Sequence, residues 1–274
     1  MTLPGSSSLP EKASHSSGQA WYRPIVSPEH GAYVMLLVSF LTGAAAAQHW
    51  TGATTLALIS AFAGFQAEHP LVLQIKQRRS WKPRLLAWGG LYAVVSFSIA
   101  AYLSLQASEL LWLYLGAIVA FAVDAISVFY RQQKSFGNEL LTFAAVCLAA
   151  PFAHIATGGA LTASIVGLWL LNTLFFSSAI FTVKLHKPKT ASLTLALIYH
   201  AIATLMACGL WYYGWLSLYS AIGFGVVLLK FTLILARRNW YQTTAIQNVA
   251  MLETSSALLF LAIVALSLLP AHLN

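Results

Sequence analysis

The stretch Ser27-Pro28-Glu29-His30-Gly31-Ala32-Tyr33 lies where a polar N-terminal segment gives way to the first long apolar run. Residues 1–20 are rich in Ser, Gly and Pro, so we expect a disordered tail there and no secretory signal. Ser27 suits an N-cap, Pro28 the first helical position, and Glu29 the positive end of a helix dipole. The stretch therefore predicts the start of a membrane-spanning helix. Ionisable groups close to a membrane are costly and often functional, which makes Glu29 and His30 candidate site residues.

The composition is that of an integral membrane protein. Of the 274 residues, 59% are hydrophobic and only 8% are charged, whereas soluble domains carry about 25% charged residues. The apolar runs are too long for the strands of a barrel, which need only ~10 residues. Cys147 and Cys208 both fall inside apolar runs, and this placement supports neither a disulfide nor a zinc site.

Nine apolar segments are long enough to cross a bilayer at about 20 residues each. We expect spans over residues 28–48, 52–68, 85–105, 110–130, 139–157, 161–183, 191–213, 215–236 and 248–269. His69-Pro70 should stop or kink the second span, and residues 71–84 could form a short interfacial helix. The sequence thus predicts an all-α, polytopic membrane bundle in which residues 21–274 form one domain.

The distribution of positive charge supports this number of spans. With nine alternating spans, the N-terminus and the 2–3, 4–5, 6–7 and 8–9 loops share one side of the membrane. These segments contain every Lys and Arg except Lys230, which lies roughly two turns from the same end of its helix. By the positive-inside rule that side is cytoplasmic, so we expect a protein of the inner (plasma) membrane with its N-terminus inside and its C-terminus outside. The net charge of +8 then indicates a membrane surface and not a nucleic-acid partner.

Acidic residues gather at the same predicted cytoplasmic level. Five of the seven acids lie at, or within about two turns of, the cytoplasmic ends of five different helices. They are Glu29, Glu68, Asp124, Glu139 and Glu253, and His30, His69 and His186 lie at the same level. This pattern predicts a polar cavity that faces the cytoplasm.

Each acid also has a structural explanation. Glu29 can complement its helix dipole, and Glu139 can cap its helix. Asp124 and Glu253 lie inside apolar runs, where ion pairing with Arg131 or Lys230 is the alternative to a functional role. Carboxylate and imidazole groups can bind a metal ion together, but adjacent helical residues point about 100° apart, so Glu29-His30 and Glu68-His69 are not expected to share one ion.

These considerations define two sets of candidate site residues. The candidate catalytic residues are Glu29, His30, Glu68, His69 and Asp124, with Glu68 and Asp124 also the candidate metal ligands. Carboxylates beside cations suit a phosphate or diphosphate, with or without Mg²⁺. The candidate substrate- or phosphate-binding residues are Arg131, Lys134, Glu139, Asn172, Lys184, Lys230 and Glu253. For Asn172, an interhelical hydrogen bond is the simplest explanation.

The motif Pro28-Glu29-His30-Gly31-Ala32, followed by an apolar span, resembles the opening signature of the YwiC-like family of bacterial membrane proteins. Later residues over most of the chain after residue 21 fit the same pattern: Arg131, Lys134, Glu139, Asn172, Phe175, Phe176 and Phe181.

More distantly, the nine-helix plan and the loop Tyr130-Arg131-Gln132-Gln133-Lys134 resemble the UbiA superfamily of intramembrane prenyltransferases. That resemblance implies a UbiA-like helix arrangement and aspartates in the 2–3 and 6–7 loops that hold Mg²⁺ and a prenyl diphosphate over a lipid-accessible cavity. In this sequence the position that corresponds to the 2–3 loop has Glu68 and His69. The 6–7 loop, residues 183–190, contains no acid.

Three classes of function fit these features. The leading hypothesis is a diverged prenyltransferase-like enzyme that acts on an isoprenoid diphosphate or a quinone-like lipid drawn from the membrane. The alternative is a proton- or ion-coupled transporter of a small molecule, with Asp124, Glu253 and Lys230 as the ion site. The third is a non-catalytic membrane assembly protein.

Overall fold

The computed structural model describes residues 22–187 and 192–269, and every regular element within these ranges is a helix. The tail expected over residues 1–20 lies outside the described residues. The helices are α1 (His30–Ala47), α2 (Gly52–Lys76), α3 (Pro83–Gln106), α4 (Leu110–Phe129), α5 (Phe136–Cys147), α6 (Ala149–Ala156), α7 (Ala163–His186), α8 (Leu193–Tyr212), α9 (Leu218–Ile222), α10 (Gly225–Ala236), α11 (Arg238–Thr243) and α12 (Ile246–Leu268).

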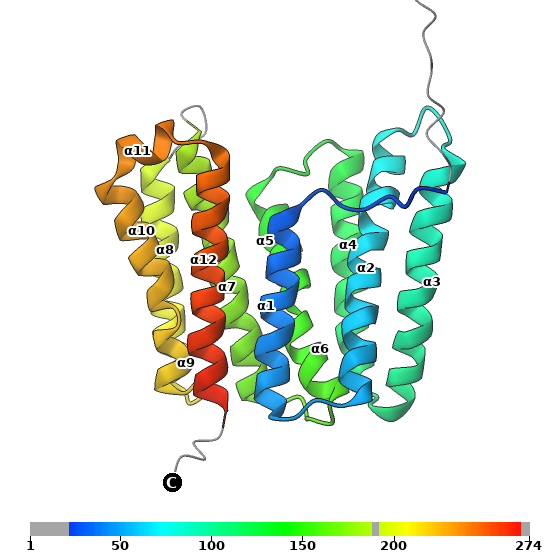
Figure 1. Cartoon of the computed structure of the whole chain (residues 1–274), viewed down its shortest axis with the longest axis horizontal. Coiled ribbons are helices and arrows are strands. Elements are labelled where there is room, and N and C mark those ends of the chain that lie inside the picture. The colour runs from blue at the N-terminus through cyan, green and yellow to red at the C-terminus, as the bar shows by residue number, and fades with distance from the viewer. Residues whose placement is uncertain (1–21, 188–191, 270–274) are drawn as a thin grey trace, which may run out of the picture.

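Nine spans are present within the described ranges, because α5 with α6 and α9 with α10 each form one broken helix that is long and apolar enough to cross a membrane. The spans run up and down in a single helical bundle (Figure 1). The prediction of an all-α, multi-pass membrane protein with nine spans is therefore confirmed.

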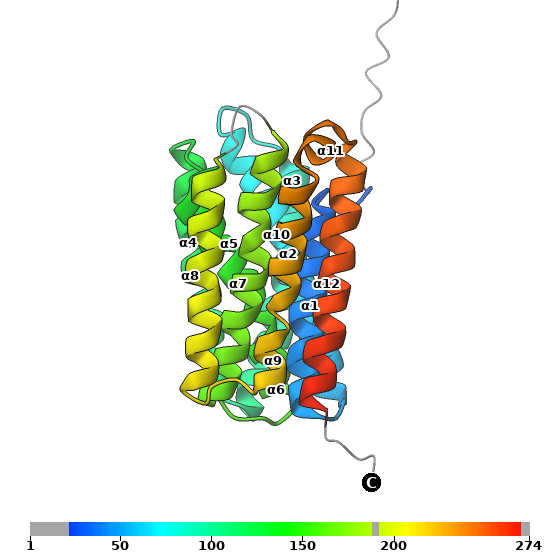
Figure 2. The same cartoon turned by 90° about the vertical axis from the view of Figure 1, so that its left-hand side faces the viewer.

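The bundle has two halves, which meet where α1 packs against α12 and where α7 packs against α5 and α6. Helices α1–α6, the N-terminal half, lie on one side of Figure 1, and α7–α12, the C-terminal half, lie on the other. Helix α1 packs against both α6 and α12 and so joins the halves. Figure 2 shows α8, α7, α10 and α12 in this order across the C-terminal half. Helix α7 is the most buried span, with 67% of its apolar window buried.

Close backbone contact between α1 and α6 depends on Gly43. A Cβ atom at this position would lie 1.9 Å from the carbonyl oxygen of Ala150, so no residue with a side chain fits without a shift of α6. Pro151 follows in α6, and its ring excludes the carbonyl of Cys147 from helical bonding. For this reason the fifth span is broken at Leu148, between α5 and α6.

The sequence predicts that His69-Pro70 stops or kinks the second span. Helix α2 does not stop there but continues to Lys76. Pro70 and Leu71 lie close to Gly89 of α3, where a Cβ atom would lie 3.4 Å from the proline Cγ and 2.9 Å from Leu71 Cδ2. The separate interfacial helix considered for residues 71–84 is therefore absent from this described part of the chain, and its first residues form the last turns of α2.

The expected N-cap role of Ser27 is wrong, because α1 begins at His30 with Glu29 at the N-cap. The backbone of Ser27 is instead tied to α1 and α2. Its N–H donates to Gln66 Oε1 at 3.0 Å, and its carbonyl accepts from the Tyr33 hydroxyl at 3.1 Å. Gln66 Nε2 in turn donates to the Tyr33 hydroxyl, which closes a ring of three hydrogen bonds. The opening motif thus anchors the N-terminal segment to α2.

One end of the bundle carries most of the described positive charge. The start of α1 and the C-terminal ends of α2, α4, α7 and α10 lie at this end, and the C-terminal end of α12 lies at the other (Figure 1). We call the first the basic end, since it holds Arg78, Arg79, Arg131, Lys134 and Arg237. The side of the membrane that it faces is a prediction.

Candidate functional site

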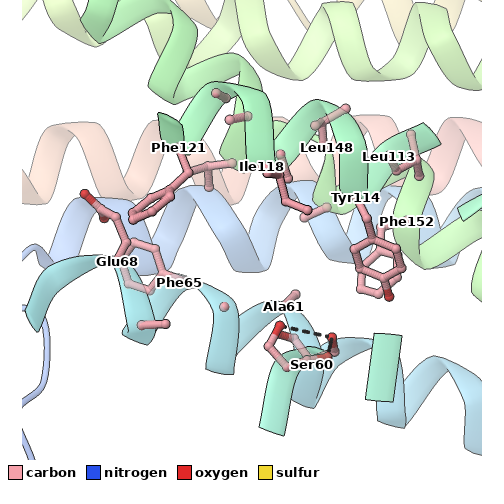
Figure 3. Close-up of a pocket in the computed structure, with 18 of the residues that line it drawn as sticks. Ser60, Ala61, Phe65, Glu68, Leu113, Tyr114, Ile118, Phe121, Leu148 and Phe152 are labelled. Carbon is pink, nitrogen blue, oxygen red and sulfur yellow. Dashed lines mark hydrogen bonds between the residues drawn. The ribbon is translucent and has the colours of Figure 1, made fainter. Parts of the chain in front are cut away.

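A cavity of about 370 Å³ lies within the N-terminal half. Side chains from α2, α3 and α4 form most of its wall, and α1, α5 and α6 complete it. Its lining is mainly Ala, Leu and Phe, which is typical of a site for an apolar small molecule. Glu68 and Phe121 lie at one end of the cavity, and Tyr114 and Phe152 lie at the other (Figure 3). The cavity is therefore elongated, with its acidic end toward the basic end of the bundle.

The cavity reaches the apolar outer surface between α3 and α4. Phe97 of α3 and Ile118 of α4 both line it, yet their exposed fractions are 56% and 47%. Ala117 lies beside Ile118 in the lining and is also exposed. The cavity is therefore open toward the face that lipid would cover in a membrane.

Asp124 contributes the most deeply buried charge of the cavity wall, with an exposed fraction of 6%. Its Oδ1 accepts a hydrogen bond from Asn138 Nδ2 at 2.6 Å. The Ser135 hydroxyl caps α5 by accepting from the Asn138 N–H at 3.4 Å, and this cap places the Asn138 side chain opposite α4. Asp124 Oδ2 is buried and has no hydrogen-bond donor among the described residues.

Glu68 lines the same cavity from α2, so the structure brings Glu68 and Asp124 to one space. The other candidate catalytic residues do not line it: His69 points elsewhere on α2, and Glu29 and His30 are exposed at the start of α1. Within the described ranges, no group of three or more His, Cys, Asp and Glu side chains could hold a metal ion. A metal bound between Glu68 and Asp124 would thus have at most these two carboxylates as acidic ligands from the described residues.

A second polar cluster is buried in the C-terminal half. Lys230 Nζ of α10, with a side chain only 2% exposed, donates to Glu253 Oε2 of α12 at 2.7 Å and to Ser178 Oγ of α7 at 3.2 Å. Thr182 Oγ1, one turn beyond Ser178, donates to Glu253 Oε1 at 2.9 Å. This cluster neutralises its own charge and satisfies both carboxylate oxygens.

Tyr241 of α11 closes this cluster toward the basic end. Its hydroxyl donates to the Thr182 carbonyl at 3.1 Å. Burial raises the pKa of the Tyr241 phenol, so it stays a protonated donor. The cluster is thus packed and hydrogen-bonded on α7, α10, α11 and α12.

A fourth acid, Glu139 of α5, forms an ion pair with Lys184 of α7. The Lys184 ammonium also lies 3.8 Å from the centre of the Phe136 ring, which stacks on Phe181. Both charged side chains are about one quarter exposed. This pair joins the two halves near the basic end.

The remaining candidates lie apart from the cavity. Arg131 and Lys134 are exposed in the turn between α4 and α5, where Arg131 has a φ of 61°. Asn172 Nδ2 donates to Thr42 Oγ1 at 3.0 Å, which is an interhelical bond. None of the seven candidate phosphate-binding residues lines the cavity. The five predicted acids therefore divide among the cavity, two ion pairs and the surface of α1.

Sequence reasoning did not select several residues that complete these sites. Asn138, the partner of Asp124, is not among the candidate site residues. Ser178 and Thr182 are one turn apart in an apolar helix, and this i, i+4 spacing of hydroxyls was the available signal. Tyr114 and Phe152, at the far end of the cavity, gave no such signal because aromatic residues are common in spans.

These features define a class: a multi-pass helical membrane protein with a laterally open, apolar cavity that carries two carboxylates at one end. A family model described as "YwiC-like protein" matches residues 26–154. The match begins at the opening motif, ends in α6, and includes every residue that lines the cavity. No curated protein and no solved structure matches the chain.

Proposed function

We propose that this chain is an intramembrane enzyme that acts on an isoprenoid or other lipid-like substrate. The observation that carries the proposal is the cavity, in which an apolar, laterally open space ends at Glu68 and Asp124. An isoprenoid chain would lie among the Ala, Leu and Phe side chains, and its head group would reach the carboxylates. Glu68 or Asp124 would then act as a base or orient the head group.

The prenyltransferase form of this proposal also requires a diphosphate. Mg²⁺ is usually held by one or two carboxylates together with substrate phosphates. Glu68 and Asp124 are such a pair, and Asp124 Oδ2 has a free lone pair. A metal would supply charge neutralisation for the leaving diphosphate. The pair fits Mg²⁺ only in this shared form, since the described chain offers no third acidic or imidazole ligand.

The proposal is tested by comparing membranes that contain the wild-type protein with membranes that contain Asp124→Asn or Glu68→Gln. We expect mass spectrometry of extracted lipids to find a species that depends on the wild type and is lost in both variants. Glu109→Gln, at a partly buried acid that lies near the opposite end and does not line the cavity, is the matched control. Identical lipid profiles for all four proteins would contradict the enzyme. Labelled prenyl diphosphate, with and without Mg²⁺, tests the prenyltransferase form separately.

A transporter is the second candidate, and the Lys230–Glu253 cluster favours it. A buried ion pair inside a membrane can serve as a proton or ion site. If the protein is a transporter, we expect it to carry protons together with its substrate. Liposomes that contain the protein and a pH-sensitive dye would then show a change of internal pH when substrate is added. Loss of the signal in Asp124→Asn or in Lys230→Met/Glu253→Leu, with normal insertion, would favour the transporter over the enzyme.

We further propose that the basic end faces the cytoplasm of the inner membrane. The support is the distribution of Lys and Arg in the loops. In a variant without Cys147 and Cys208, a cysteine placed at Lys134 should escape an impermeant maleimide applied to spheroplasts, and one placed at Glu109 should react. The reverse labelling would overturn the orientation.

A further inference from the structure

Within the described residues no cation lines the acidic end of the cavity, and Lys76 at the end of α2 attracts the Glu68 carboxylate only from outside the lining. Glu68 and Asp124 are its charged residues, and no Lys, Arg or His of the described chain lines it. Arg131 and Lys134 are exposed in a turn, and Lys184 and Lys230 pair with other acids. In the absence of a metal ion, a phosphate head group would therefore add negative charge beside two carboxylates, which repel it.

Hydrogen-bond acceptors without donors gather at the same end. Asn138 uses both amide hydrogens, one to Asp124 Oδ1 at 2.6 Å and one to the Gln133 carbonyl at 3.2 Å. Asp124 Oδ2 and Asn138 Oδ1 are both buried and have no donor among residues 22–187 and 192–269. Buried acceptors of this kind are costly unless a donor reaches them.

The hydrogen bond to Asp124 fixes the orientation of the Asn138 amide, so reversing this amide cannot remove the unpaired acceptors. If its amide were reversed, its oxygen would face the carboxylate of Asp124, and two acceptors would meet at hydrogen-bonding distance. The protein thus supplies one donor to Asp124 and leaves the second oxygen for another molecule. That oxygen belongs to a residue of the cavity wall.

We propose that the cavity binds an amphiphile whose head group donates hydrogen bonds to Asp124 and Glu68, either a primary ammonium or a hydroxyl. The inference rests on the proposed lipid-like substrate and specifies its head group. Both heads share the donor chemistry that the unpaired acceptors require, and neither brings negative charge. The apolar chain extends toward Tyr114 and Phe152 (Figure 3). From Asp124 to Tyr114 the helix rises by about 15 Å, which an extended dodecyl chain spans.

The test uses the full protein in phosphatidylcholine nanodiscs and four isotope-labelled dodecyl probes. Dodecylamine and dodecanol donate hydrogen bonds, dodecyltrimethylammonium has charge but no N–H, and dodecyl phosphate is an anion. Binding is the excess of probe over empty nanodiscs, measured by mass spectrometry. We expect dodecylamine or dodecanol to bind at least tenfold more tightly than the phosphate, and dodecylamine to exceed its trimethyl analogue. The stronger of the two donors identifies the head as cationic or neutral.

Variants locate the binding. Asp124→Asn keeps an oxygen for Asn138 but loses the charge, and we expect at least a tenfold loss of binding. Glu68→Gln is the second variant, which decides the question if Asp124→Asn does not fold. Ala117→Trp should block the lateral opening, whereas Glu109→Gln should have no effect.

Two results would overturn the inference. Preferred binding of dodecyl phosphate, or unchanged amine and alcohol binding in both acid variants, would refute the donor head group while leaving a lipid-like substrate in the cavity. Failure of every probe to bind, with Ala117→Trp indistinguishable from wild type, would refute the lipid-filled cavity as well.

Discussion

The two halves of the bundle differ in the hydrogen-bond partners that they give to an acidic side chain near the basic end. In the C-terminal half, Glu253 accepts hydrogen bonds from Lys230 and Thr182, so both of its oxygens have donors. In the N-terminal half, Asp124 accepts one bond from Asn138, and its other oxygen has no donor within the described chain. The first acid is packed among helices, whereas the second faces a cavity.

This difference separates a charge that stabilises packing from a charge that is available to a ligand. Removing one member of a buried pair leaves its partner uncompensated, which is why such pairs resist substitution. Removing the charge of Asp124 leaves no cation unpaired within residues 22–187 and 192–269. The C-terminal half should therefore depend on its charges for stability, and the N-terminal half should not.

The largest expected effect is that of Glu253→Leu, which leaves the Lys230 ammonium buried with Ser178 as its remaining partner. We expect a loss of about 3–5 kcal/mol in the free energy of unfolding. Thermal and denaturant unfolding in detergent measure it. The double variant Lys230→Met/Glu253→Leu should recover most of the loss because no charge is then unpaired. A stable single variant would contradict the structural role of the pair.

The next effect concerns the packing of the N-terminal half. Gly43→Ala places a Cβ atom 1.9 Å from the Ala150 carbonyl oxygen, so α1 and α6 must move apart. We expect a loss of about 1–3 kcal/mol in the free energy of unfolding. The same change at Gly31 meets nothing within 4 Å and gains helix propensity, so it should be neutral or stabilising. Equal effects of the two changes would show that the close approach does not matter.

A smaller effect is expected for Asp124→Asn, and it tests the comparison directly. Asparagine can still accept the hydrogen bond from Asn138, and no cation is left alone. The free energy of unfolding should change by no more than about 1 kcal/mol. The same unfolding assays apply. A loss as large as that of Glu253→Leu would mean that both acids are structural and would remove the distinction between the halves.

The spans could be predicted from the sequence, because bilayer thickness alone requires long apolar runs. Small residues permit close helix contact in membranes, and Gly43 allows such contact between α1 and α6. The ion pair between Glu253 and Lys230 was predicted only as the alternative to a functional role for Glu253. The sequence did not predict how the five acids divide among the cavity, the two ion pairs and the surface of α1, since pairing depends on which faces of separate helices meet. Asp124 and Glu253 occupy similar positions in their spans, yet one has Lys230 beside it and the other has Asn138.

An effect of similar size concerns the opening motif, whose two ends are bound and whose middle is exposed. Tyr33→Phe removes the hydroxyl that donates to the Ser27 carbonyl and accepts from Gln66. We expect a loss of about 1 kcal/mol and faster amide hydrogen exchange over residues 22–30, measured by mass spectrometry. Gln66 precedes Glu68 by two residues, so this ring holds the N-terminal segment beside the acidic end of the cavity. Glu29→Gln, at an exposed residue of the same motif, should leave exchange unchanged. If it raised exchange as much as Tyr33→Phe, Glu29 would have a structural role like that of Glu253.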